Sequence, residues 1–387
     1  MAVKSKKLKV FVAMSGGVDS SVAAALLKKQ GHEVTGVFIR GWEPPQLAAP
    51  PSAGQVCDWR EERRSALRAA ATLDLPLLTV DASEEYRSRI VEPMIVDYRA
   101  GRTPNPDILC NRLIKFDFLW RFARAHGAET LATGHYVQIA RRDSDFVATS
   151  PPRPGAGKLL SRLLISADRE KDQTYFLWTL TQADLAHTLF PVGSYRKSQV
   201  RTLAKRFRLP NADKPDSQGL CFVGPLDFKE FLRAYLPVKL GSVHNEEGKE
   251  IGEHDGAHFY TIGERRGFRV TAHTPDSAPL YIIAKDMAKN ILVVSAQPLK
   301  SASAQNEIIL DRVNWIGTAP FSKIIKARIR YRAPLVSCRV ESLEDNYVRV
   351  IFTKLLFGAT LGQSCVLYDY RGQICLGGGV ISEDLKL

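Results

Sequence analysis

The sequence predicts an α/β protein in which a doubly wound parallel sheet is followed by a small connecting domain and a C-terminal antiparallel β-barrel. From residue 8 to about residue 210, short β-rich runs alternate with helical stretches and glycine turns, as in a parallel sheet covered on both faces. After about residue 250, β-rich runs recur roughly every ten residues, which is typical of a small barrel or sandwich. With 387 residues, the chain is too long for one ordinary core.

The N-terminal part is predicted to contain four parallel strands. We expect these strands over residues 8–14, 34–39, 75–80 and 130–133. A helix follows Gly16 and Gly17 and runs through Lys29, and further helices are expected over 61–73, 84–98 and 111–125. Four prolines between residues 44 and 51 indicate a long loop after the second strand.

The rest of the chain is predicted to form two smaller domains. A helix over 227–235 and several glycine turns lie in the connecting segment, about 211–280. Strands are expected over 281–284, 291–294, 324–331, 347–352 and 365–370, and we assign all of them to the barrel. The predicted domains are therefore 1–215, 216–280 and 281–387.

Composition narrows the class of protein. The formal net charge is +13, which favours a polyanionic partner such as nucleic acid, although general solubility explains such an excess equally well. No apolar run approaches the roughly 20 residues of a membrane span, and the basic start lacks the apolar core of a secretory signal, so we expect a cytoplasmic protein with no membrane partner. The six cysteines form no CxxC pair, which argues against a zinc site or a disulfide framework.

The strongest local signal is the segment from Ser15 to Ser21, SGGVDSS, between a predicted strand and a predicted helix. Its two glycines let backbone amides approach a phosphate, and the following helix directs its positive end at the same anion. Asp19 is well placed to hold a magnesium ion. The segment is not the Walker-type loop, because GxxxxGK[ST] occurs nowhere in the chain. The alternative is a tight turn that binds nothing.

Two cysteines lie in segments that could carry chemistry. In residues 101–111, GRTPNPDILCN, two prolines stiffen a loop that delivers Asp107 and Cys110 to the start of a predicted helix. A cysteine there, with Arg112 and Lys115 close by, is expected to have more thiolate, but a buried small hydrophobic residue is an equal alternative. Asp107 could cap the helix or accept a proton. Cys221 lies in a glycine-containing turn, DSQGLCFV, where a structural role is the simpler reading of that segment alone.

Taken together, the motifs resemble a known family. SGGVDSS is similar to the signature of the PP-loop ATP pyrophosphatases, which have a Rossmann-like domain and split ATP between the α and β phosphates. That loop, TPNPDILCN and SQGLCFVG, in this order, resemble the tRNA-specific 2-thiouridylase family (MnmA/TrmU). The resemblance continues through ATGHY, KDQTYFL, TIGERRG and GQS, and so covers nearly the whole chain.

The resemblance implies the ATP-dependent 2-thiolation of the wobble uridine of tRNA, with Lys, Glu and Gln tRNAs expected, and with ATP and Mg²⁺ required. Cys221 would carry a persulfide, and Cys110 would release sulfide from it or attack it, which leaves a Cys110–Cys221 disulfide. Asn105, Pro106 and Asp107 would contact the target base, with Asp107 as acid or base. The implied ATP contacts are Ala13, Met14, Ser15, Gly16, Gly17, Val18, Asp19, Ser20, Ile39 and Gly134. The implied tRNA contacts are His135, Lys171, Asp172, Gln173, Arg330, Tyr331 and Gln363.

Two basic segments add to the expected RNA surface. Lys326, Arg328, Arg330 and Arg332 alternate with other residues, and on a strand this period places all of them on one face, with Tyr331 free to stack on a base. The segment 196–208 has six cations and no acid, and reads as a basic helix that contacts tRNA. In both cases a solvated surface is the alternative.

Two other functions remain possible at this stage: a PP-loop amidotransferase or ligase that uses ammonia, and an RNA-binding protein with a retired nucleotide site. The first leaves Cys110 and Cys221 unexplained, and the intact SGGVDSS loop argues against the second. A cysteine desulfurase or a sulfur-relay protein is the expected persulfide donor. The sequence does not determine the oligomeric state.

Overall fold

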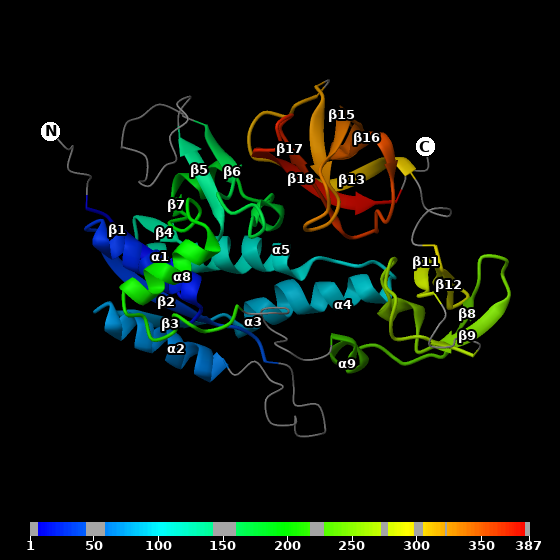
Figure 1. Cartoon of the computed structure of the whole chain (residues 1–387), viewed down its shortest axis with the longest axis horizontal. Helices are drawn as coiled ribbons and strands as arrows, with labels where there is room; N and C mark the ends of the chain where they lie inside the picture. The colour runs from blue at the N-terminus through cyan, green and yellow to red at the C-terminus, as the bar shows by residue number, and fades with distance from the viewer. Residues whose placement is uncertain are drawn as a thin grey trace.

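The computed structural model describes residues 7–43, 59–141, 160–216, 228–271, 278–297, 305–321 and 323–383. Three groups of strands are visible in it (Figure 1). A parallel sheet with its helices lies on the left, a barrel at the top, and a second small sheet on the right. The four prolines that predict a long loop after the second strand lie outside the described residues.

The N-terminal sheet is parallel throughout, in the order β3-β2-β1-β4-β7 among the described strands. Its strands are β1 (Lys9–Ala13), β2 (Glu33–Arg40), β3 (Leu77–Asp81), β4 (Thr130–Ala132) and β7 (Thr188–Leu189). Alternate residues of β1 face opposite sides: Val10 and Val12 pack with α1 (Val18–Lys29), α2 (Trp59–Thr72) and α8 (Lys197–Arg206), while Phe11 packs with α6 (Leu119–Ala125). The sheet is therefore covered on both faces, as the sequence predicts.

Two long helical stretches follow β3, and both contain π-helical turns. The first consists of α3 (Ser83–Tyr86), η1 (Arg87–Val91) and α4 (Glu92–Arg99). The second consists of α5 (Pro106–Cys110), η2 (Asn111–Phe118) and α6. The second stretch starts five residues earlier than predicted, because Asn105 and Pro106 supply a cap and a first-turn proline.

The central sheet has the order β10-β9-β8-β12-β11. Its strands are β8 (Gly241–His244), β9 (Glu250–His254), β10 (Arg269–Val270), β11 (Tyr281–Asp286) and β12 (Ile291–Ser295), with α9 (Phe228–Arg233) and the 3₁₀ turn η4 (Ala257–Phe259) beside them. The sequence analysis grouped 281–284 and 291–294 with the barrel, but β12 pairs in parallel with β8. Spacing alone could not separate these two runs from the barrel strands, because both sheets use short strands at similar intervals.

The C-terminal strands close into a barrel, because β13 pairs with both β16 and β18. The barrel strands are β13 (Gln305–Trp315), β14 (Ile325–Arg328), β15 (Val336–Ser342), β16 (Val348–Leu356), β17 (Ser364–Tyr368) and β18 (Ile374–Ser382), with the 3₁₀ turn η5 (Glu344–Asn346) before β16. Leu310, Val340, Val350 and Leu367 are completely or almost completely buried in its core. The predicted fold class is confirmed: a parallel sheet covered on both faces, a central domain and an antiparallel barrel.

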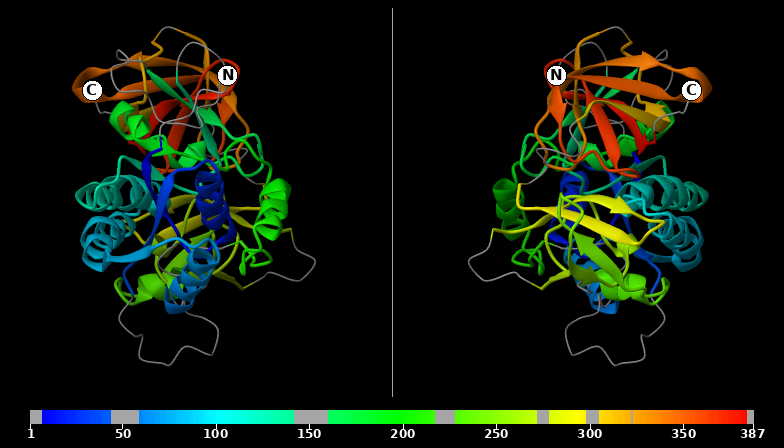
Figure 2. Two further views of the ribbon diagram at one scale, coloured as in Figure 1. Left: turned by 90° about the vertical axis from the view of Figure 1, so that its left-hand side faces the viewer. Right: turned by 90° about the vertical axis from the view of Figure 1, so that its right-hand side faces the viewer.

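Part of the N-terminal half joins the barrel sheet. Strands β5 (Val137–Arg141) and β6 (Ser161–Ile165) form an antiparallel pair, and β6 continues the sheet at β18. The short elements η3 (Thr174–Phe176) and α7 (Gln182–Ala186) follow β6 in the sequence. Figure 2 shows the barrel seated above the other two sheets in both side views. The exact boundaries of the three predicted domains stay a prediction.

Among the helices that the structure describes, none has the length and apolar character needed to cross a membrane.

Candidate nucleotide site and cysteine loop

The turn between β1 and α1 requires glycine at its centre. Gly16 has a φ of +81°, and a Cβ added there would lie 2.2 Å from the carbonyl oxygen of Glu62. Only glycine avoids both the left-handed backbone cost and this collision. Gly17 is the N-cap of α1, and it has no side chain to cap the first-turn amides. Among the described residues, no side chain caps the start of α1, so its first-turn backbone N–H groups are available to bind phosphate.

Hydroxyl and amide side chains donate hydrogen bonds to the backbone carbonyls of this turn. Ser20 and Ser21 donate to the Gly17 carbonyl at 3.1 and 3.0 Å. Ser65 of α2 and Asn211 donate to the Gly16 carbonyl at 2.8 and 3.0 Å. With its carbonyls bound on the inner side, the turn is fixed before any ligand arrives, which lowers the ordering cost of binding an anion.

Asp19 lies in the first turn of α1 and has two strong donors. The Tyr136 hydroxyl donates to its Oδ1 at 2.7 Å, and the Lys197 ammonium reaches both carboxylate oxygens at 2.8 Å. Burial, followed by the Asp19 charge, raises the pKa of Tyr136 above its ordinary value, so that hydroxyl stays protonated. Mg²⁺ is commonly bound by one or two carboxylates together with substrate phosphates, and Asp19 fits that donor set.

The other predicted ATP contacts border the same turn. A Cβ on Gly134 would lie 2.7 Å from the Ser20 backbone nitrogen, so the chain after β4 passes directly against the start of α1. Met14 donates its backbone N–H to Val37 of β2. Ile39 lies near the end of β2, half-exposed. All of the predicted ATP contacts therefore lie at the carboxyl end of the sheet or at the start of α1, where ligands bind in open α/β sheets.

A cluster of charged side chains links this turn to Asp216, the first residue of the DSQGLCFV segment that contains Cys221. Asp216 accepts from Lys171, Lys197 and Arg201 at 2.7, 2.7 and 3.1 Å. Burial alone would raise the pKa of Asp216, but the hydrogen bonds from Lys171 and Lys197 lower it to about 2. Lys197 bridges Asp216 to Asp19. Cys221 itself lies outside the described residues.

The loop that carries Asp107 and Cys110 differs from the prediction. The side chain of Asn105 accepts the Ile108 N–H at 3.3 Å and caps the helix, and Pro106 occupies the first turn. Asp107 is therefore not the cap. Cys110 is the fifth residue from the start of α5 rather than a residue at the helix N-terminus, so the expected help from the helix end is weak there.

Cys110 is buried, with 1% of its surface exposed. Its Sγ lies 2.9 Å from the hydroxyl of Tyr86 on α3, and both residues belong to the cluster against which Ile39 packs. Cys338, Cys365 and Cys375 are also buried, and burial raises the pKa of each thiol. These three therefore stay protonated and inert, and they lie in the barrel strands.

The residues just before Asn105 are held by both smaller domains. Thr103 donates its N–H to Leu361 of the barrel, and Gln363 donates from its side chain to the Thr103 carbonyl at 2.8 Å. On the other side, Lys285 of β11 donates to the carbonyls of Gly101 and Tyr260 at 2.8 and 2.7 Å. The loop that leads to α5 is thus positioned by contacts from two other parts of the chain.

Several residues that we predict to contact RNA form hydrogen bonds with other groups of the protein. His135 is buried between Phe116 and Phe190, with Thr133 Oγ1 2.7 Å from its Nδ1, and burial holds the pKa of this imidazole well below its usual value. Asp172 is buried and accepts from Ser166 and Thr174, and burial raises its pKa.

The neighbours of Asp172 also have protein partners. Lys171 pairs with Asp216, and Gln173 accepts the backbone N–H of Tyr136 at 2.8 Å. The contacts of His135, Lys171, Asp172 and Gln173 with tRNA stay predictions.

The predicted basic strand is shorter than expected. Strand β14 ends at Arg328, so Lys326 and Arg328 share it, whereas Arg330 and Arg332 lie in the turn that follows. Arg332 has a φ of +62°, which no strand tolerates, and the prediction that all four cations share one strand face is wrong. Arg330 donates to the Ile262 carbonyl and to Thr360 Oγ1, both at 2.9 Å, and joins the barrel to the central domain.

Tyr331 does not stand alone on the barrel surface. Its ring packs on Phe176 with centroids 4.5 Å apart. Its contact with RNA, like those of Arg330 and Gln363, is still a prediction.

The predicted basic helix is confirmed as α8, Lys197–Arg206. Lys197 and Arg201 are partly buried and bind Asp216, whereas Lys205 is exposed and pairs with the exposed Asp213 at 3.0 Å. Arg196, Arg206 and Arg208 are also exposed, so these cations face the solvent, where a polyanion can reach them.

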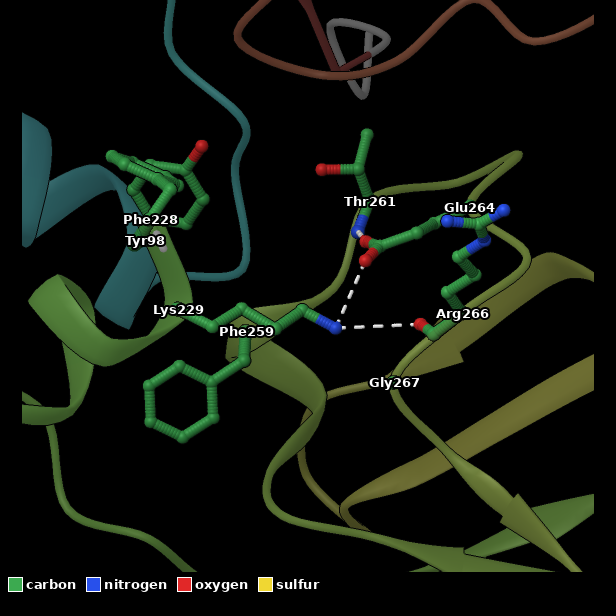
Figure 3. A pocket seen from close by; sticks show the side chains of 8 residues that line it. All are labelled: Tyr98, Phe228, Lys229, Phe259, Thr261, Glu264, Arg266 and Gly267. Carbon is green, nitrogen blue, oxygen red and sulfur yellow. Dashed lines mark hydrogen bonds and ion pairs between the residues drawn. The ribbon is translucent and has the colours of Figure 1, made fainter. Parts of the chain in front are cut away.

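A cavity of about 350 Å³ lies beside Thr261, whose hydroxyl contacts that of Thr103 at 3.2 Å. Figure 3 shows the ammonium of Lys229 directed at the Glu264 carboxylate, 2.9 Å away, and at the Arg266 carbonyl. The lining residues are Tyr98, Phe228, Lys229, Phe259, Thr261, Glu264, Arg266 and Gly267. The cavity thus adjoins the cysteine loop, but it is separate from the nucleotide turn.

Sequence reasoning missed several residues of this site. Tyr136 lies in the ATGHY motif, and Lys197 lies in the basic helix, but nothing local shows that both reach Asp19. Asn211 and Lys285 gave no signal at all. The cap formed by Asn105 could have been found, because asparagine followed by proline is a typical helix start.

Comparison with known proteins covers the chain almost completely. Family models match residues 8–225, 229–296 and 305–381, and are described as the tRNA methyl transferase HUP domain, the tRNA methyl transferase PRC-barrel domain and the aminomethyltransferase beta-barrel domain. A Nitrosomonas eutropha protein named tRNA-specific 2-thiouridylase MnmA is 40% identical over 382 residues, which are 98% of this chain and 99% of that protein. A Shigella flexneri protein of the same name is 40% identical over 383 residues, 98% of each chain.

Solved structures are more distant. A 4-thiouridine synthetase in complex with RNA and ATP is 17% identical, with a TM-score of 0.34, over 59% of this chain and 50% of that one. A likeness of this size carries no argument about fold or function.

Proposed function

Since the chain belongs to the tRNA-specific 2-thiouridylase family, we propose that it replaces the C2 oxygen of a tRNA uridine with sulfur at the expense of ATP. The observation that carries the proposal is the match to 2-thiouridylases along 98% of the chain, which includes all three parts of the fold. The preformed PP-loop turn with Asp19 supports the ATP-dependent step.

The first step we propose is adenylylation of the target base. The C2 oxygen of uridine attacks the α-phosphorus of ATP, the bond to the β-phosphate breaks, and pyrophosphate leaves into the turn at Gly16 and Gly17. The amides at the start of α1 would bind the departing phosphates. Asp19 would hold Mg²⁺, which supplies charge neutralisation at the phosphates. The predicted contacts Ala13–Ser20, Ile39 and Gly134 would hold the nucleotide.

The second step transfers sulfur from a persulfide on Cys221. The Cys110 thiolate attacks the inner sulfur of that persulfide. A Cys110–Cys221 disulfide forms, and hydrosulfide leaves with the electron pair of the broken S–S bond. Hydrosulfide attacks C2, and AMP leaves with the former C2 oxygen. A dithiol reductant then returns both cysteines to thiols, and a cysteine desulfurase or sulfur-relay protein reloads Cys221.

The proposed substrate is the wobble uridine of Lys, Glu and Gln tRNAs. Asn105, Pro106 and Asp107 would contact the flipped-out base, with Asp107 as acid or base. Arg330, Tyr331 and Gln363 of the barrel, together with His135 and Lys171–Gln173, would bind the tRNA. The side chain of Asp107 is half-exposed at the first turn of α5, as a base contact requires.

Nucleoside mass analysis tests this proposal. The protein is incubated with an unmodified tRNA-Lys transcript, ATP, Mg²⁺ and a desulfurase with cysteine. We expect 2-thiouridine from the native protein and none from Cys221→Ser or Cys110→Ser. A matched Cys338→Ser variant, altered in the barrel, should retain activity. Thiolation by Cys221→Ser at the native rate would overturn the persulfide role, and pyrophosphate release without sulfur incorporation would overturn the proposed product.

A further inference from the structure

Tyr86 occupies a place that the proposed mechanism does not use. It ends α3, directly after β3, and its backbone N–H donates to Ala82 at 2.9 Å. Its side chain is 5% exposed. The ring lies against the backbone just past β2, since a Cβ added at Gly41 would be 3.5 Å from it. Tyr86 therefore stands between the end of β2, where Ile39 is a predicted ATP contact, and the helix that carries Cys110.

The hydroxyl of Tyr86 lies 2.9 Å from the Sγ of Cys110, inside a buried cluster. We propose that Tyr86 is the positioning residue of Cys110: its hydroxyl fixes the sulfur in the thiol form and donates to it in the thiolate form. This inference rests on the proposed role of Cys110 as a nucleophile. It assigns Tyr86 no bond-making step.

The helix geometry explains why such a donor is needed. A buried thiolate is costly unless something hydrogen-bonds to it. The helix N-terminus cannot supply this, because α5 starts at Pro106 and the influence of a helix end fades within the first turn. Arg112 is exposed while Cys110 is buried. A phenolic hydroxyl at 2.9 Å meets the need directly.

The packing gives this contact its precision. Tyr86 has few rotatable bonds, and its ring is confined between the Gly41 backbone and the cluster that contains Ile90, Met94 and Ile114. A hydroxyl at the end of a confined ring holds its partner more tightly than one on a mobile side chain. Tyr86 consequently contacts both the Cys110 sulfur and the backbone at the end of β2.

Tyr86→Phe removes only the hydroxyl, and Tyr98→Phe is the matched control. Tyr98 is a second buried tyrosine of the same cluster, and its ring packs on Phe228. Because Cys110 is buried, its ionisation is followed without a reagent. The ultraviolet absorbance of the thiolate is recorded from pH 6 to pH 10 as the difference between each protein and the same protein carrying Cys110→Ser. A hydrogen bond to a charged group shifts ionisation by about one pH unit or more. We expect the pH midpoint of thiolate formation to rise by that amount in Tyr86→Phe and to stay at the native value in Tyr98→Phe.

A native midpoint in Tyr86→Phe would overturn the inference. If that variant fails to fold, 3,5-difluorotyrosine at position 86 keeps the shape and strengthens the donor, so the midpoint should instead fall; an unchanged midpoint again contradicts us. Single-turnover thiolation separates the two proposals. We expect about tenfold slower sulfur transfer by Tyr86→Phe at neutral pH, with pyrophosphate release and ATP affinity unchanged. Full activity of Cys110→Ser would refute the role of Cys110, while the thiolate titration would still report on Tyr86.

Discussion

The nucleotide turn and the cysteine loop are built in different ways. At Gly16 and Gly17 the backbone shape follows from adjacent residues, and the side chains that support it come from the parallel-sheet part of the chain. The approach to α5, from Gly101 to Thr103, is held by Lys285 of the central sheet and by Leu361 and Gln363 of the barrel region.

The two regions therefore depend on different parts of the chain. The side chains that hold the nucleotide turn all come from the parallel-sheet part of the chain, so the phosphate binding that we propose for it should not depend on the other two parts. The cysteine loop takes its position from bonds to the central sheet and to the barrel region, and one of the residues that hold it, Gln363, is a proposed tRNA contact. The following changes should separate the two regions, in descending order of expected effect.

Asp19→Asn should have the largest effect, because it removes the negative charge that the proposed Mg²⁺ site requires while keeping the shape of the side chain. We expect ATP-dependent pyrophosphate release, measured with tRNA present, to fall on the order of 100-fold. Asp213→Asn removes an exposed carboxylate paired with Lys205 and should leave the rate unchanged. An Asp19→Asn variant of native activity would place the nucleotide elsewhere.

Lys285→Met should change how stability depends on pH. Burial lowers the pKa of Lys285 to about 8, below the value in the unfolded chain, so the unfolded state binds one more proton between pH 8 and pH 10. The native protein should therefore gain stability relative to Lys285→Met across this window, on the order of 2 kcal/mol. Urea unfolding at several pH values measures it, and parallel curves for the two proteins would contradict this prediction.

Arg330→Met tests the junction between barrel and central domain. Two charge-assisted hydrogen bonds are lost, to Ile262 and Thr360, so the free energy of unfolding should fall by about 2 kcal/mol in a thermal or urea experiment. Arg332→Met, at an exposed neighbouring position, is the control and should change stability little. Equal stabilities of the two variants would mean that Arg330 does not brace the junction.

Ser65→Ala should have the smallest effect. Ser65 donates to the buried Gly16 carbonyl, but Asn211 also donates there, so that oxygen keeps a partner. We expect a loss of about 1 kcal/mol in unfolding free energy and a small rise in the KM for ATP. A loss several times larger would show that the turn depends on Ser65 alone.

Sequence patterns predicted the parts of the molecule whose causes are local. The alternation of strands and helices, the glycine turn before α1 and the barrel strands all follow from residues close in sequence. Sequence patterns did not predict features that depend on contacts between residues far apart in the sequence. The residues around Arg330 give no sign that its guanidinium donates to the carbonyl of Ile262, 68 residues away in the sequence. Likewise, no local feature shows that Cys110 is buried against Tyr86 rather than exposed at a helix start.

The central claim, that ATP activates the C2 oxygen of uridine, is tested most directly by following that oxygen. A tRNA transcript carrying ¹⁸O at C2 of the target uridine is thiolated in one turnover, and the AMP produced is analysed by mass spectrometry. The account predicts that AMP carries the label, because the C2 oxygen leaves bonded to the α-phosphorus. Unlabelled AMP, with ¹⁸O recovered in water, would contradict adenylylation of the base.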